Sequence, residues 1–206
     1  GRLSKGPAGY REVGCATLSF CDENGDALAA VRMARAPEPK KATLKGQLAA
    51  ELLAALGKQP TLRIVKVADG ANDNWEFLSA ALPDGDEVVD FYHASEHLHA
   101  AVAAAYGDGT RDTQYRFESL RETLRDDRDG VTKVIRALDY LRKRHPRREV
   151  IAGTARYFRR YRDRMDYAGL KARGLPIGSG VVEAACKTLV AQRLKLSGMR
   201  WGAPGA

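Results

Sequence analysis

Apolar positions along the first third of the chain predict a hairpin followed by a helix. The apolar runs 12–20 and 27–34 flank a polar segment that contains Asn24-Gly25. An Asn-Gly pair between two such runs predicts a β-hairpin, because both residues tolerate a positive φ. Leucines then recur at helical spacing over residues 41–57, and this pattern stops at Gly57. The spacing predicts an amphipathic helix.

The rest of the pattern predicts two more strands and then a long helical region. Residues 61–68 and 86–91 predict buried strands, with a helix over about 72–82 between them. Helix formers dominate residues 92–106 and 111–167, and a last helix is expected from about 180 to 197. The order strand, strand, helix, strand, helix, strand places the chain in the α/β class.

Composition narrows the compartment in which we expect the protein. No apolar run approaches the ~18 residues that cross a bilayer, and the start of the chain lacks a secretory pattern. The three cysteines, an odd number without paired metal-ligand spacing, favour free thiols over a disulfide framework. We therefore expect a cytoplasmic protein without a membrane partner.

The net charge of +8 is concentrated in the second half of the chain. Residues 1–100 contain 11 Lys and Arg against 14 Asp and Glu, whereas residues 101–206 contain 23 against 12. Arginine presents a planar fork of donors that matches phosphate. A solvated helical surface and a nucleic-acid partner both explain such a segment, and the arginine clusters within 142–144 and 156–164 favour DNA or RNA.

Three carboxylates lie at the ends of predicted elements. Asp69 and Asp90 each follow a predicted strand, and Glu183 lies in the first turn of the last predicted helix, after Gly178-Ser179-Gly180. Aspartates at neighbouring strand ends can share metal ions, and Mg²⁺ or Mn²⁺ prefers oxygen ligands. Each acid also has a structural explanation, because aspartates cap turns and helices and a glutamate in a first helical turn complements the helix dipole.

Histidines near Asp90 form a second candidate cluster. His93, His97 and Glu96 fall near one face of the helix predicted after Asp90, and such a set is able to hold zinc. A single helix rarely completes a zinc site, and no cysteine pair is present to close it. We favour the interpretation that His93 supports Asp90 or contacts nucleic acid.

The motifs together resemble a known family. They are Asp69-Gly70-Ala71, Asp90-Phe91-Tyr92-His93, Gly178-Ser179-Gly180-Val181-Val182-Glu183, Gln192-Arg193 and Gly198-Met199-Arg200-Trp201. In this combination the chain resembles the DDE transposases of bacterial insertion sequences, in the Kra-type group related to the Mutator class. The resemblance runs from the predicted hairpin to the C-terminus, and its middle motif resembles the Asp-x-x-His signature of Mutator-like enzymes.

The resemblance implies a ribonuclease-H-like core with an all-helical insertion before the last helix. Asp69 then corresponds to the second catalytic aspartate and Glu183 to the final glutamate, both as ligands of Mg²⁺ or Mn²⁺, while Asp90 and His93 are an accessory pair. The implied domains are the core over 1–104, the basic helical insertion over 105–175 and the catalytic helix over 176–206.

The family cleaves DNA strands and joins them to a target with two metal ions. The implied partners are therefore double-stranded DNA, at transposon ends and target, and further copies of the chain bound to that DNA. The DNA-binding candidates are seven basic residues: Arg156, Arg159, Arg160, Lys187, Arg193, Lys195 and Arg200.

The first catalytic aspartate of the family lies on a strand before the hairpin, and this sequence begins about where that strand should end. That strand is central, between the second and the fourth, so we expect the 206 residues to be catalytically inactive and poorly stable alone. Two other functions stay open. One is a noncatalytic DNA-binding module or relic, in which Asp69 and Glu183 are dispensable. The other is a metal-dependent nuclease on the same fold, which only a joining assay separates from a transposase.

Overall fold

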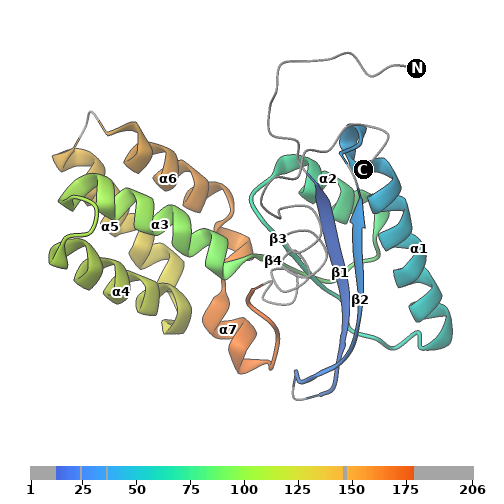
Figure 1. Cartoon of the computed structure of the whole chain (residues 1–206). Helices are drawn as coiled ribbons and strands as arrows, with labels where there is room; N and C mark the ends of the chain where they lie inside the picture. Colours follow the sequence, from blue (N-terminus) through green and yellow to red (C-terminus); the bar gives the residue numbers. More distant parts are fainter. Residues whose placement is uncertain (1–12, 24, 36, 146–147, 179–206) are drawn as a thin grey trace, which may run out of the picture. The chain divides into compact units, whose positions relative to one another are not determined.

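The computed structural model describes residues 13–178, apart from residues 24, 36, 146 and 147 (Figure 1). Within this part of the chain, one compact unit ends at Leu62 and a second begins at Arg63. Strands and helices both contribute up to residue 89, and helices alone follow. The α/β class predicted from the apolar pattern is therefore confirmed.

The first unit contains a β-hairpin. Strands β1 (Gly14–Cys21) and β2 (Ala27–Arg35) pair antiparallel, as the Asn-Gly signal predicted. In the turn, Gly25 adopts a φ of 86° and donates its N–H to the carbonyl of Asp22. Glycine takes this positive φ without a steric penalty.

A helix follows the hairpin in the same unit. After a short 3₁₀ turn, η1 (Pro39–Lys41), helix α1 runs over Ala42–Lys58, within one residue of the predicted 41–57. The carboxylate of Glu38 accepts the N–H of Leu44 at 3.0 Å, which satisfies one of the donors left open at a helix start. Leu44 and Leu52 are buried, as the leucine spacing predicted, whereas Leu53 is 55% exposed.

The second unit begins with a parallel βαβ arrangement. Strands β3 (Val65–Ala68) and β4 (Asp86–Val89) pair in parallel, and helix α2 (Asn72–Ala81) connects them. Lys66 is buried, and its Nζ donates to the carbonyl of Leu78 at 2.8 Å near the end of α2. Within the described residues this parallel pair and the hairpin are separate two-stranded sheets.

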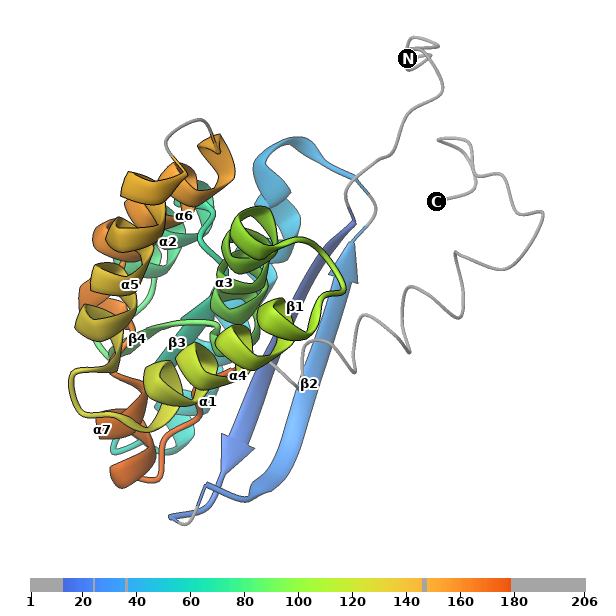
Figure 2. The ribbon, with the colours of Figure 1, turned by 90° about the vertical axis from the view of Figure 1, so that its left-hand side faces the viewer.

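Four helices then form a closed bundle. They are α3 (Phe91–Tyr106), α4 (Arg111–Asp126), α5 (Gly130–Arg144) and α6 (Glu149–Arg160). Each helix contacts the next, and α6 returns to α3 (Figure 2). The core of the bundle receives a fully or almost fully buried side chain from each helix: Leu98, Leu124, Leu138 and Phe158.

Two short helical elements complete the described chain, η2 (Arg162–Arg164) and α7 (Tyr167–Ala172). The region predicted to be helical over 111–167 is thus helical, with breaks at its turns. The helix predicted from about 180 lies outside the described residues. None of the helices that the structure describes is both long and apolar enough to cross a membrane.

Candidate functional site

Asp69 and Asp90 lie at the same end of the parallel sheet. Ala68 and Val89 pair across the two strands, and each aspartate is the next residue along its chain segment. The N–H of Asp90 also donates to the carbonyl of Ala68 at 2.9 Å. The carboxyl ends of paired parallel strands thus place both acids at one edge, the position at which α/β proteins gather function.

Both acids make local hydrogen bonds. Asp69 Oδ1 accepts the N–H of Ala71 at 3.1 Å and Nδ2 of Asn74 at 2.9 Å. Asp90 is 4% exposed, and its Oδ1 accepts the N–H groups of Tyr92 and His93 at the start of α3. Asp90 therefore caps helix α3, and Asp69 caps the turn before α2, so a structural explanation holds for both residues. No described residue donates to Oδ2 of Asp69, so this oxygen of an exposed carboxylate is open to a ligand.

The last described residues lie against Asp90. The N–H of Phe91 donates to the carbonyl of Ile177 at 2.9 Å. A Cβ on Gly178 would stand 2.8 Å from the ring of Tyr92 and 3.9 Å from Oδ1 of Asp90. The start of the Gly-Ser-Gly motif is therefore beside Asp90. Glu183 lies outside the described residues, as do the DNA-binding candidates Lys187, Arg193, Lys195 and Arg200.

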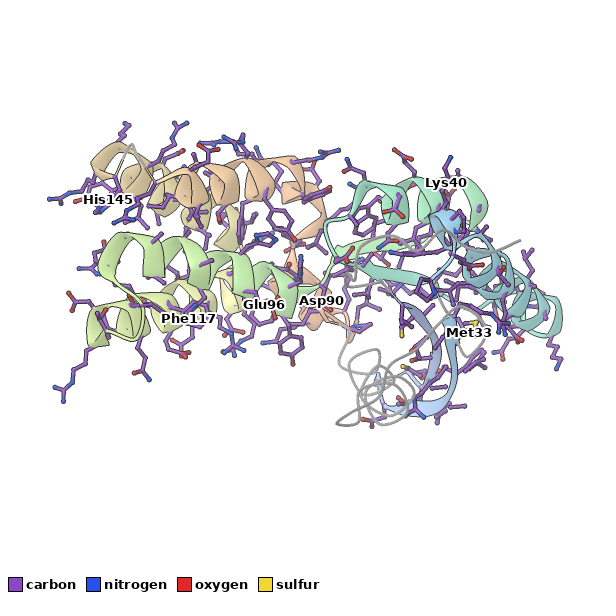
Figure 3. The ribbon with its side chains drawn as sticks, turned by 45° about the horizontal axis from the view of Figure 1, so that its top comes forward. Met33, Lys40, Asp90, Glu96, Phe117 and His145 are labelled. Carbon is purple, nitrogen blue, oxygen red and sulfur yellow. The ribbon has the colours of Figure 1, made fainter. Side chains whose placement is uncertain are left out.

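Two histidines on α3 stack against a tyrosine of α6. His97 lies parallel to the ring of Tyr157 at 4.2 Å, and His93 meets His97 edge-on at 4.8 Å. Burial, assisted by neighbouring His93, lowers the pKa of His97. His93 thus touches Asp90 through its backbone N–H, while its imidazole belongs to this stack. Figure 3 places Asp90 at one end of α3 and Glu96 further along it. Among the described residues no group of three metal-ligating side chains forms, and the zinc alternative gains no support.

Helix α6 also holds the loop that carries Asp69. Tyr161 donates its hydroxyl to the carbonyl of Gly70 at 2.7 Å and lies 3.0 Å from Oδ1 of Asn72. The ring of Tyr157 covers Gly70 so closely that a Cβ there would stand 2.3 Å from Cε2. These tyrosines were missed by sequence reasoning. Their signal is an Arg-Tyr pair at 156–157 that recurs one helical turn later, at 160–161.

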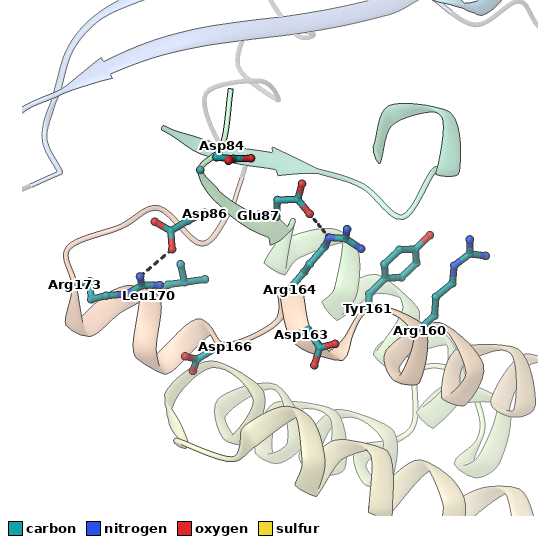
Figure 4. Close-up of a pocket in the computed structure, with 11 residues that line it drawn as sticks. Asp84, Asp86, Glu87, Arg160, Tyr161, Asp163, Arg164, Asp166, Leu170 and Arg173 are labelled. Atoms are coloured by element: carbon teal, nitrogen blue, oxygen red, sulfur yellow. Dashed lines mark hydrogen bonds and ion pairs between the residues drawn. The ribbon is translucent and has the colours of Figure 1, made fainter. Parts of the chain in front are cut away.

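A hollow of about 570 Å³ lies at the other end of β4 (Figure 4). Acidic and basic residues line it together, and two of its carboxylates accept hydrogen bonds from arginines: Arg173 donates to Asp86 at 2.8 Å, and Arg164 donates to Glu87 at 2.7 Å. Burial alone would raise the pKa of Glu87, but hydrogen bonds from Arg164 and Ser79 hold it below its usual value. This hollow is a structural ion-pair cluster at the start of the strand.

We expect Glu87→Gln to lower the free energy of unfolding by about 1–2 kcal/mol at pH 7, because a charge-assisted hydrogen bond is lost. Because the pKa of Glu87 is lower in the folded state than in the unfolded state, its carboxylate stabilises the fold above the ordinary carboxyl pKa. This contribution is lost as the pH falls through the pKa of the folded state. The deficit of the variant should therefore shrink below about pH 4. Urea titrations at pH 7 and at pH 3.5 measure both effects. Glu118→Gln, at a loose pair 3.9 Å from Arg121, is the control, and an equal deficit at both pH values would contradict the assignment.

The three arginines predicted on α6 as DNA-binding residues differ in their surroundings. Arg159 makes an ion pair with Asp139 of α5. Arg156 pairs with Glu149 at 2.6 Å, and both side chains are largely exposed. Arg160 has no carboxylate partner among the described residues, and its guanidinium lies 5.4 Å from the ring centre of Tyr161. Arg160 is therefore the arginine of this helix that is most available to an anion.

Comparisons with protein-family models, with curated proteins and with solved structures find no match. The function is accordingly inferred from the sequence and the geometry of this chain.

Proposed function

We propose that the chain is part of a DDE transposase, which cleaves and joins DNA strands with Mg²⁺ or Mn²⁺ held by Asp69 and Glu183. One observation carries the proposal: Asp69 and Asp90 follow directly on paired residues of two parallel strands, and Gly178 lies beside Asp90. Double-stranded DNA and further copies of the chain are the partners that this function implies.

The order of the strands supports a ribonuclease-H-like core. The hairpin β1–β2, helix α1 and the parallel unit β3–α2–β4 follow one another along the chain. In a ribonuclease-H-like sheet the first strand lies between the second and the fourth. Without that central strand, such a sheet leaves one antiparallel pair and one parallel pair, which are the two sheets of the described residues. A strand with an aspartate between these two pairs would thus complete the proposed core.

The donor chemistry of the acids suits a hard divalent cation, because carboxylate oxygens are the ligands that Mg²⁺ and Mn²⁺ prefer. When bound, a metal pair activates the attacking hydroxyl and stabilises the leaving oxygen. Hydrogen bonds from Ala71 and Asn74 orient the carboxylate of Asp69 before any ligand arrives. Glu183 follows Gly178 by five residues. An extended chain of this length spans at most about 18 Å, which limits the distance between Glu183 and Gly178.

Metal binding tests this function directly. We expect Asp69→Asn to weaken the binding of Mn²⁺ by about tenfold or more, because a charged ligand is removed. The asparagine retains a side-chain oxygen for the N–H of Ala71, so the loop should keep its shape. Titration of the full chain with Mn²⁺, followed by electron paramagnetic resonance, measures the affinity.

Glu76→Gln, at an exposed acid of the neighbouring helix α2, is the matched control and should leave the affinity unchanged. Equal Mn²⁺ affinity in the wild type and in Asp69→Asn would show that Asp69 is not a metal ligand.

A noncatalytic DNA-binding module is the second candidate function. The observation that favours it is that both described aspartates already act as local caps. In this case Asp69→Asn and Glu183→Ala leave metal affinity and DNA affinity unchanged. A nuclease on the same fold would bind metal like a transposase, and a DNA-joining assay with the complete set of acids separates the two.

A further inference from the structure

A second hollow, of about 560 Å³, opens between helix α6 and the loop after β3. Three residues of α6 line it together with the residue that follows this helix, one residue of the loop and the first residue of α2: Arg156, Tyr157, Arg160, Tyr161, Gly70 and Asn72. No carboxylate belongs to this lining. Arg160 and Tyr161 also line the first hollow, but that hollow contains carboxylates, of which Asp86 and Glu87 each accept a hydrogen bond from an arginine.

Two arginines beside this hollow are able to bind an anion without breaking a strong ion pair. Arg160 has no carboxylate partner among the described residues. Arg156 is bound to Glu149, but the side chains of this pair are 67% and 78% exposed, and such exposed pairs contribute little free energy. Residues 156 and 160 are one helical turn apart, so both guanidinium groups rise from one face of α6. An anion in the hollow would meet two arginine donors.

One tyrosine that lines the hollow carries a polar atom without a partner among the described residues. The hydroxyl of Tyr157 is buried, and no described residue accepts its hydrogen bond. The edge of the ring at Cε2 lies against Gly70, next to Asp69. Burial and the negative charge of Asp69 both raise the pKa of Tyr157, so the phenol keeps its proton and can only donate to an anion. A buried donor without an acceptor is uncommon in folded proteins and points to a missing ligand.

We propose that this hollow binds a phosphate group of the DNA backbone, with Arg160 and Arg156 supplying charge and Tyr157 supplying a neutral donor. The assignment rests on the proposed function for the identity of the polynucleotide. It places one backbone phosphate beside Asp69, so that a neighbouring phosphodiester is presented to the carboxylate edge of the sheet. Bound phosphate would thus position the strand, without taking part in bond cleavage.

Binding of a 30-base-pair DNA duplex to the full chain, in EDTA and over a series of salt concentrations, tests the assignment. Arg160→Gln should weaken binding about fivefold and reduce the slope of log affinity against log salt by about 1, because one ionic phosphate contact is lost. Tyr157→Phe should weaken binding about threefold with an unchanged slope, because it removes a neutral hydrogen bond. Neither change removes a hydrogen bond or an ion pair found in the described residues.

Arg125→Gln is the matched control, since it removes the same charge from α4, where Asp126 holds the guanidinium. Its affinity and its slope should stay at the wild-type values. Wild-type binding by Arg160→Gln, or an equal loss in Arg160→Gln and Arg125→Gln, would overturn the assignment. So would a lower melting temperature of Arg160→Gln with unchanged DNA binding, because another segment of the chain would then fill the hollow.

The result is independent of the Mn²⁺ titration. Loss of DNA affinity in both site variants, with Mn²⁺ affinity unaffected by Asp69→Asn, would keep the phosphate hollow and reject the metal-dependent function. Unchanged DNA affinity in both site variants, with Mn²⁺ affinity weakened by Asp69→Asn, would keep the metal site and reject phosphate binding in the hollow.

Discussion

Phe158→Ala is expected to lower the free energy of unfolding by about 3–5 kcal/mol, the usual loss when a fully buried phenylalanine is truncated. Phe158 has no exposed surface and lies on α6, the helix that contacts both α3 and α5. Its ring meets that of Tyr157 edge-on at 5.7 Å. The cavity would therefore open directly behind the tyrosine that covers Gly70, so the bundle core and the candidate site should weaken together.

Urea denaturation of the full chain, followed by circular dichroism, measures this loss. Val150→Ala serves as the control on the same helix, because Val150 is 51% exposed and exposed truncations usually change stability by about 0.5 kcal/mol or less. Similar losses in the two variants would show that α6 does not pack as described.

Gly70→Ala is expected to destabilise the protein by about 1–3 kcal/mol, the usual cost of overpacking. The new Cβ would stand 2.3 Å from Cε2 of Tyr157, which is far inside contact distance. The ring cannot move aside freely, because it is stacked on His97 at 4.2 Å and meets Tyr161 edge-on. Thermal denaturation of the variant measures the effect.

A double-mutant cycle isolates this clash. In a Tyr157→Ala background, Gly70→Ala should cost little, because the atoms that it meets are gone. Gly153→Ala is the matched control: its Cβ would meet only Arg156, at 3.8 Å, and alanine is favoured over glycine inside a helix by up to about 1 kcal/mol. Equal costs of Gly70→Ala in both backgrounds would exclude the ring contact as their cause.

Short sequence patterns correctly predicted the elements that depend on residues close together in the chain. The hairpin followed from Asn24-Gly25, and α1 followed from leucines at helical spacing. Strand lengths were less predictable, because they depend on a distant partner. The strand predicted over 61–68 pairs only from Val65 onward, where β4 begins with Asp86. The strand predicted to reach residue 91 stops at Val89, because Asp90 already caps α3.

The sequence predicted those parts of the candidate site that follow from the local pattern, and it missed the contacts between residues that are distant in the chain. The two aspartates could be found because each follows a short apolar run in the sequence. The hydroxyl of Tyr161 reaches Gly70 across 91 positions, and no local pattern encodes such a contact. Likewise, only the packing of α6 shows that Arg159 is committed to Asp139 while Arg160 is not.

Asp90 joins two elements without a loop. Its N–H extends the β3–β4 ladder to Ala68, and its carboxylate starts α3. Folding alone therefore accounts for this acid, whatever chemistry the site performs. Asp69 is exposed, and its carboxylate is bonded to Ala71 and Asn74, so it does not join two elements in this way. Under the proposed metal-dependent function, a substitution at residue 69 should thus impair metal binding with less cost to folding than a substitution at residue 90.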